Sequence, residues 1–287
     1  MEIAFALGCS RRDPAGFGGQ ALPTLREHYE ASAHHLPARL SDQAQVRPTR
    51  VYLGHEFCER LLPRPPELRA ALRRAAAVDL AVTLATPVAS DAGMASLRHL
   101  LPLLPDGGEV VCNDWGVVAL VRREHPHLRA IAGRQLCRMT KDPRLPSSRW
   151  AQLYPHGLGA PTFQALLARC AVEAIELDVP PYVEAAFFAA LPRPAHVHAP
   201  FGYAAKGRSC RIGSLHQSAP LRFAPGHPCQ RECLDYRART ARPQPGADLP
   251  TVQRGNTMLY GHSAAMGEVL AAAVQRGQVA RLVLESC

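Results

Sequence analysis

Residues 109–123, EVVCNDWGVVALVRR, contain one complete strand–helix unit. Glu109–Asn113 is a short apolar run typical of a buried strand, and apolar residues at helical spacing predict a helix over Trp115–Arg123. Asp114 lies at the junction, where an aspartate is a common helix N-cap. A buried strand followed at once by an amphipathic helix is the repeating unit of parallel α/β folds.

The same alternation extends in both directions along the chain. Further strands are predicted at Ile3–Leu7, Arg50–Leu53, Leu80–Leu84, Leu128–Gly133, Ala174–Leu177, Ala195–His198 and Val279–Glu285. Further helices are predicted at Pro66–Ala77, Ala95–Leu104, Pro161–Cys170 and Ala264–Arg276. Eight nearly continuous apolar strands in 287 residues predict a (β/α)8 TIM-like barrel, formed by residues 1–287 as one domain. A doubly wound open sheet is the alternative, although no G-x-G-x-x-G follows the first strand.

Two segments interrupt this rhythm. Ser32–Pro48 is polar and is predicted to be a loop or a frayed helix. Residues 202–250 are rich in Pro, Gly and Arg and contain three cysteines. Loops of this length within a domain are usually functional or disordered, and metal ligands would order this one. We therefore expect 202–250 to be a cluster-binding insert late in the chain.

The cysteines are the strongest indication of chemistry. Three lie in the late insert and one follows the second predicted strand: Cys58, Cys210, Cys229 and Cys233. Thiolates are soft ligands that select iron–sulfur clusters, zinc or Cu(I). The spacing C-x3-C with two distant partners leaves a cluster, a zinc ion and no metal all open. The other cysteines are expected in the core (Cys9, Cys112, Cys137 and Cys170) or, for Cys287, to be incidental.

Composition narrows the cellular setting and the partner classes. Nine cysteines in a long chain do not indicate a disulfide framework, and no apolar run approaches the roughly 20 residues of a membrane span. Ala6-Leu7-Gly8-Cys9 faintly suggests a lipoprotein cleavage site, but the short apolar stretch favours a buried strand in a cytoplasmic protein. The net charge of +9 comes almost entirely from scattered arginines, because lysine occurs only at 141 and 206. With few aromatic residues, this argues for a solvated basic surface rather than nucleic-acid binding.

Polar residues follow the predicted strands at the end where barrel enzymes place their active sites. The candidates for a pocket there are His55, Asn113, Asp114, Arg134, Lys141, Asp178 and His198. Each also has a plain structural interpretation. Asp114 and Asp178 are possible N-caps, and His196 and His198 share one strand face as metal ligands or as hydrogen-bonded core residues. Lys141-Asp142-Pro143-Arg144 is an anion clamp or a solvated turn. No G-x-S-x-G or H-E-x-x-H is present.

Several short motifs, in order, resemble a known family. They are Val51-Tyr-Leu-Gly-His-Glu-Phe-Cys58, Asn113-Asp-Trp-Gly116, Gly133-Arg-Gln-Leu136 leading into Lys141-Asp-Pro-Arg144, Glu176-Leu-Asp178 and the late cysteines. Together they resemble the UbiV-like proteins of the collagenase-like (U-type) peptidase superfamily, over residues 1 to about 260. The long gap from Cys210 to Cys229, the Ser32–Pro48 segment and the high arginine content depart from the family pattern.

The resemblance implies a function as well as a fold. Family members carry a [4Fe–4S] cluster on four cysteines, whose positions match Cys58, Cys210, Cys229 and Cys233. It implies a heterodimer with a UbiU-like protein, aided by a UbiT-like lipid-binding accessory protein. This pair supports oxygen-independent hydroxylation of a small aromatic or prenylated substrate in ubiquinone biosynthesis. A peptidase or other hydrolase, a non-catalytic cluster-bearing subunit and an RNA-modifying relative remain alternatives.

Overall fold

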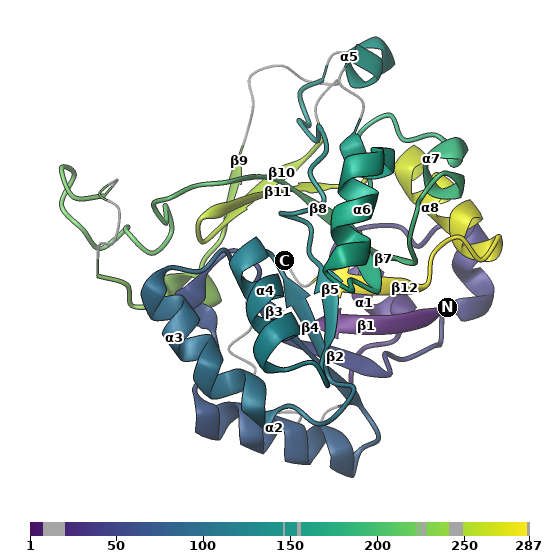
Figure 1. Ribbon diagram of the computed structural model, residues 1–287. Coiled ribbons are helices and arrows are strands. Elements are labelled where there is room, and N and C mark those ends of the chain that lie inside the picture. The colour runs from purple at the N-terminus through teal and green to yellow at the C-terminus, as the bar shows by residue number, and fades with distance from the viewer. Residues whose placement is uncertain are drawn as a thin grey trace.

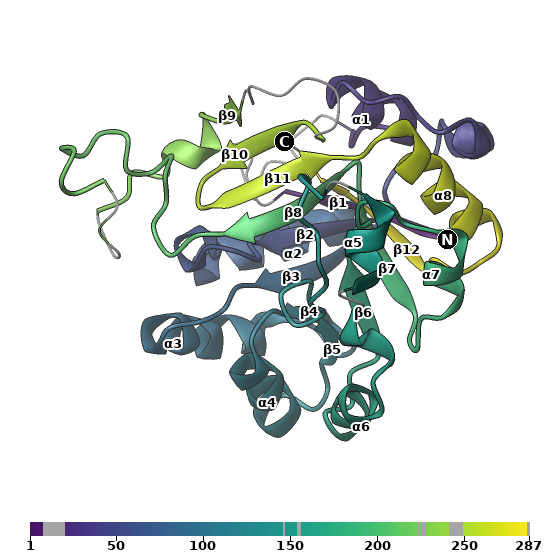
Figure 2. The same cartoon turned by 90° about the horizontal axis from the view of Figure 1, so that it is seen from above.

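The computed structural model describes residues 1–7, 21–145, 147–153, 156–222, 224, 228–240 and 249–285. Within these residues, eight parallel strands close into a barrel in the order β1-β12-β7-β6-β5-β4-β3-β2 (Figures 1 and 2). The strands are β1 (Glu2–Ala6), β2 (Arg50–Gly54), β3 (Ala81–Thr86), β4 (Glu109–Cys112), β5 (Arg129–Ala132), β6 (Ala174–Leu177), β7 (Ala195–Ala199) and β12 (Arg281–Glu285). The predicted (β/α)8 barrel is confirmed, and each of the eight strands lies within two residues of its predicted bounds.

Helices connect the strands and cover the outside of the barrel. They are α1 (Leu25–Ala31), α2 (Pro65–Ala77), α3 (Asp91–Leu100), α4 (Trp115–Glu124), α5 (Ser148–Leu153), α6 (Pro161–Arg169), α7 (Ala185–Ala189) and α8 (Ala264–Gln275). Short 3-10 helices add η1 (Ala38–Gln43), η2 (Glu59–Leu61), η3 (Leu101–Leu103), η4 (Gly157–Gly159) and η5 (Glu232–Leu234). The segment Ser32–Pro48, expected to be a loop or frayed helix, thus contains η1. No helix in the described residues is long and apolar enough to cross a membrane.

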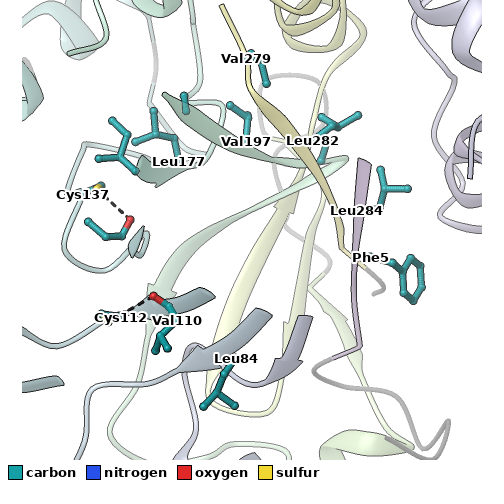
Figure 3. Packing of buried hydrophobic residues seen from close by; sticks show 14 of the residues in the cluster. Phe5, Leu84, Val110, Cys112, Cys137, Leu177, Val197, Val279, Leu282 and Leu284 are labelled. Atoms are coloured by element: carbon teal, nitrogen blue, oxygen red, sulfur yellow. Dashed lines mark hydrogen bonds between the residues drawn. The ribbon is translucent and has the colours of Figure 1, made fainter. Parts of the chain in front are cut away.

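The hydrophobic core lies mainly between the barrel and its helices. Alternate strand residues such as Phe5, Leu84 and Leu177 point outward into this layer (Figure 3). Cys112 and Cys137 belong to it, as predicted, and their thiols donate hydrogen bonds to backbone carbonyl groups. Cys170 packs against the core but is only half-buried. Cys9 and Cys287 lie outside the described residues.

A second sheet is inserted between β7 and helix α8. Its four antiparallel strands run in the order β8-β11-β10-β9, with β8 (Phe201–Lys206), β9 (Ala238–Thr240), β10 (Thr251–Arg254) and β11 (Thr257–Gly261). The prediction that 202–250 is a loop is therefore wrong for β8 and β9. Strands β10 and β11 are joined by a hairpin whose two-residue turn is Gly255-Asn256. The backbone at Gly255 has a φ of +56°, which glycine adopts without strain.

The second sheet lies over the C-terminal ends of the barrel strands (Figure 1). The Tyr203 hydroxyl in β8 donates a hydrogen bond to the carbonyl oxygen of Arg134, which follows β5. The Asn256 side chain in the hairpin donates one to the carbonyl oxygen of Phe57, which follows β2, at 2.8 Å. The insert thus covers the end of the barrel where the loops after the strands converge.

Candidate metal centre

All four predicted ligand cysteines line one cavity between the barrel and the second sheet. The cavity has a volume of about 480 Å³, and its wall includes Cys58, Cys210, Cys229 and Cys233. Cys58 comes from the loop after β2, and the other three come from the insert between β8 and β9. Residues up to 175 positions apart in sequence therefore meet in one place.

The segment that carries Cys58 is held from several sides. Besides the hydrogen bond from Asn256 to Phe57, the Gln135 side chain donates one to the carbonyl oxygen of Glu56. Cys58 then precedes η2, and its carbonyl oxygen accepts from the Leu61 amide at 3.2 Å. These contacts fix the backbone at Cys58 before any ligand binds.

Backbone amides point at two of the other cysteine sulfurs. The Gly213 amide donates to Sγ of Cys210 at 3.1 Å, and the Arg231 amide donates to Sγ of Cys229 at 3.3 Å. Arg231 adopts a left-handed φ of 60°, which turns the chain between Cys229 and Cys233. Amide donors of this kind stabilise thiolates and tune the potentials of the clusters that thiolates hold.

Two glycines leave the space around these sulfurs open. A Cβ at Gly213 would lie 3.0 Å from Sγ of Cys210 and 3.5 Å from Sγ of Cys229. A Cβ at Gly255 would lie 3.3 Å from Cβ of Cys233 and 3.8 Å from Sγ of Cys210. Side chains at either position would fill the space toward which the thiols point.

The sulfur spacing is wider than a single metal ion requires. Among the described residues, no three of the cysteine sulfurs lie within 4.8 Å of one another. A tetrahedral zinc ion with Zn–S bonds of about 2.3 Å holds its sulfur ligands about 3.8 Å apart. Binding one zinc ion through all four cysteines would therefore require the sulfurs to move closer together.

Burial and charge around the thiols indicate which kind of group the cavity could hold. Burial raises the pKa of both Cys58 and Cys210, and the neighbouring Cys229 raises each further. Metal binding would have to displace those thiol protons. The cavity wall also carries four cationic side chains against Glu59 alone: Arg60, Lys206, Arg208 and Arg254. This lining suits a group with net negative charge.

A buried ionic cluster occupies the barrel interior just below the cavity. Arg134 is fully buried, and its guanidinium donates to the carboxylates of Glu56, Asp178 (2.8 Å) and Glu285. The aromatic rings of Phe57 and Tyr203 lie 5.4 and 5.6 Å from the guanidinium carbon. Arg134 and Asp178, both predicted site residues, are thus in direct contact, and Asp178 is not a helix N-cap.

Lys141 and His198 belong to the same cluster. Lys141 forms an ion pair with Asp178, whereas Asp142 and Arg144 pair with each other at the surface. The solvated-turn interpretation of 141–144 is therefore wrong for Lys141. The two ring nitrogens of His198 lie 2.9 Å from Glu285 and 3.1 Å from Glu176. Since both nitrogens face carboxylates, His198 is best described as an imidazolium.

The contacts of His196 and His198 support hydrogen-bonded core residues rather than metal ligands. Glu56, His198 and Glu285 place one ligand atom each within 4.8 Å of one another, a spacing that suits a metal ion. However, the Arg134 guanidinium already donates to both of these carboxylates. Nδ1 of His196 lies 3.8 Å from a carboxylate oxygen of Glu176 and accepts a hydrogen bond from the Arg281 guanidinium at 3.2 Å. A cationic side chain takes the place that a metal ion would have.

The ionic contacts continue along the barrel axis to its other end. Tyr52 donates to Glu176 at 2.7 Å and accepts from Arg281, which in turn holds Glu109 through two hydrogen bonds. Barrel interiors are usually filled by branched apolar side chains. The described part of this interior instead contains one mainly apolar layer, with charged groups on both sides of it. The layer consists of Ala4, Tyr52, Ala85, Val111, Ile131, Ala174 and Val283.

The remaining predicted residues divide between the cavity and the framework. His55 lines the cavity, and its Nδ1 accepts a hydrogen bond from the Phe57 amide at 3.0 Å. Burial lowers the pKa of His55 to about 4, so its ring is neutral at pH 7. The buried Asn113 side chain donates a hydrogen bond to the carbonyl oxygen of Thr86 and accepts one from the amide of Gln135. Asp114 is the N-cap of α4, accepting from Gly116 at 2.6 Å.

Several residues of the site were not predicted. Glu56, Glu285 and Glu176 complete the ionic cluster, and Lys206 and Asn256 line the cavity. Glu56 lies in the motif Val51–Cys58, just after the second predicted strand, and Glu285 ends the last predicted strand. Their positions at strand ends could therefore have indicated both as site residues. Nothing in the local sequence marks Lys206 or Asn256.

Comparisons with known proteins add little to this picture. Neither models of known protein families nor curated protein sequences give a match. One solved structure similar to this chain is a glycoside hydrolase family 18 N-acetylglucosaminidase from Paenibacillus barengoltzii. The match covers 100% of this chain and 95% of that chain at 12% identity, with a TM-score of 0.37. A likeness at this level gives no information on substrate or activity.

Proposed function

We propose that this chain is an iron–sulfur protein that binds one [4Fe–4S] cluster through Cys58, Cys210, Cys229 and Cys233. The observation that carries the proposal is that these four side chains, from separate segments, line a single cavity. A [4Fe–4S] cluster has four irons, and each would bind one of the four thiolates. The space left open at Gly213 and the cationic side chains of the wall support an anionic group in this cavity.

The biological role follows from the resemblance together with the position of its motifs. The residues 54–58, 113–116 and 133–136 that carry the resemblance all follow barrel strands at the end that faces the cavity. We infer a UbiV-like subunit that acts in the cytoplasm with a UbiU-like partner and a UbiT-like accessory protein. The reaction class is oxygen-independent ring hydroxylation of an aromatic or prenylated substrate in ubiquinone biosynthesis.

The chain's own residues would hold the cluster and shield it. When bound, the cluster supplies one-electron transfer or a Lewis-acidic iron. Asn256 and Gln135 fix the Cys58 segment, and the amides of Gly213 and Arg231 support two of the thiolates. The second sheet covers the barrel end and limits access of water to the thiols.

The first test measures iron, acid-labile sulfide and zinc in protein purified without oxygen. We expect about four irons and four sulfides per chain in the wild type, and no cluster in Cys229→Ala. Cys170→Ala is the matched control, since Cys170 packs against the core away from the cavity. Equal iron in the two variants, or one zinc and no sulfide in the wild type, would overturn the assignment.

The second test addresses the pathway. We expect co-expression with a UbiU-like protein to yield a stable heterodimer that supports ring hydroxylation of a ubiquinone precursor without oxygen. Loss of that hydroxylation in Cys229→Ala would link it to the cluster. Peptide hydrolysis that persists in Cys229→Ala, with no heterodimer, would replace this proposal with the hydrolase alternative.

A further inference from the structure

Lys206 is the most enclosed cationic head group of the cavity region that lacks a partner. It ends β8, where it pairs with Thr257 of β11, and its half-buried side chain lines the cavity. No hydrogen bond or ion pair to its ammonium is formed by the residues that the structure describes. Partial burial of an ammonium is costly unless a negative group binds it, so a negative group in the cavity would be favourable at this position.

The nearest acidic side chains are already engaged. Glu59 accepts hydrogen bonds from the amide and hydroxyl of Ser90, at 3.1 and 2.8 Å. Asp114 is the N-cap of α4. Burial lowers the pKa of Lys206, while the charges of Cys58, Glu59 and Asp114 act in the opposite direction, Cys58 most strongly. Lys206 and Cys58 both line the cavity that contains the proposed cluster site.

We propose that Lys206 is the charge partner of the bound cluster, offsetting part of its negative charge and favouring its reduced form. This inference rests on the proposed function. A [4Fe–4S] cluster with four thiolates carries a net charge of about −2 in its oxidised form, and one electron makes it more negative. An ammonium in the cavity wall would stabilise the reduced form more than the oxidised form, which would raise the reduction potential.

The test compares Lys206→Met, which removes the charge, with Lys206→Arg, which keeps it. Arg222→Gln is the control, because Arg222 is an exposed cation outside the cavity wall. Each protein is loaded without oxygen, its iron and sulfide are counted, and its cluster is titrated with dithionite as the reductant. We expect Lys206→Met to show a more negative potential than the wild type, with Lys206→Arg and Arg222→Gln close to the wild type.

The outcomes separate this inference from the proposed function. A wild type without iron and sulfide refutes the cluster itself. A loaded Lys206→Met with wild-type potential refutes only the role of Lys206. Loss of the cluster in Lys206→Met but not in Lys206→Arg supports the role, because the retained charge restores binding.

An independent readout covers the case in which neither variant loads. Lysine occurs only at 141 and 206, and Lys141 is buried against Asp178. An amine-acylating reagent followed by peptide mapping therefore reports on Lys206, with the Met1 amine as internal reference. We expect acylation of wild-type Lys206 to be several-fold slower in the loaded protein than in the metal-free protein. Equal rates would overturn the inference.

Discussion

The barrel interior and the cysteine cavity adjoin at one end of the molecule but differ in how their charges are balanced. In the interior, Arg134 contacts three carboxylates and Lys141 contacts one of them. In the cavity, backbone amides donate to the sulfurs of Cys210 and Cys229, and no described residue forms an ion pair with Lys206. The charges of the interior are paired within the folded chain, whereas the proposed anionic cluster would balance the cationic side chains of the cavity wall. The cavity is therefore the first place to test for function.

The largest effect should come from breaking the balance in the interior. Arg134→Leu leaves Glu56, Asp178 and Glu285 buried without their cation, which should lower the free energy of unfolding by about 3–5 kcal/mol. Urea unfolding measures this. Arg98→Leu, at an exposed pair with Glu124, is the control and should cost less than about 1 kcal/mol. Similar costs in both variants would mean that the interior is not held by these ion pairs.

A smaller effect should appear as pH dependence of stability. Burial and Arg134 act to lower the pKa of His198, but Glu56 and Glu176 outweigh them and raise it to about 9. Because the folded pKa exceeds the unfolded one, this stabilisation is full below about pH 6.5 and is lost as the pH rises through 9. The free energy of unfolding should fall by up to roughly 3 kcal/mol over that range. His198→Asn should flatten the decline between pH 6.5 and 8.5, and an unchanged slope would contradict a charged His198.

The smallest effect should come from the cavity in its metal-free state. Cys210→Ala removes a half-buried thiol that only an amide contacts, so metal-free protein should lose less than about 1 kcal/mol of unfolding free energy. Cys112→Ala, in the fully buried core, should cost about 1–2 kcal/mol. A reversed order in urea unfolding would mean that the cavity cysteines contribute to the apoprotein fold, and would weaken the contrast between the two regions.

Much of the barrel could be predicted from the sequence because each strand and helix is marked by a pattern within a short stretch of residues. Each strand is a short apolar run such as Ala174–Leu177, and each helix carries an apolar stripe that packs on it. The second sheet was missed because β8 (Phe201–Lys206) contains no Val, Ile or Leu and opens a segment rich in Pro, Gly and Arg. Gly255-Asn256 between alternating residues is nevertheless a hairpin pattern that was available.

The convergence of the four cysteines could be predicted from the sequence, but their surroundings could not. Four cysteines stand out by residue type alone, and the structure brings them to one cavity. The contact between Arg134 and Glu285 joins residues 151 positions apart and exists only because the barrel closes. Lys206 lies in the cavity because of how β8 pairs with β11. Such contacts depend on tertiary closure, which residue spacing does not encode.

The pairing of β1 with β12 has a consequence for biosynthesis. A ribosome makes β1 first and the closing strand β12 last among the barrel strands, and long-range pairings of this kind form slowly. All four cavity cysteines, from Cys58 to Cys233, are translated before β12. The proposed cluster would therefore find all of its cysteine ligands on a nascent chain before β12 is made and the barrel closes.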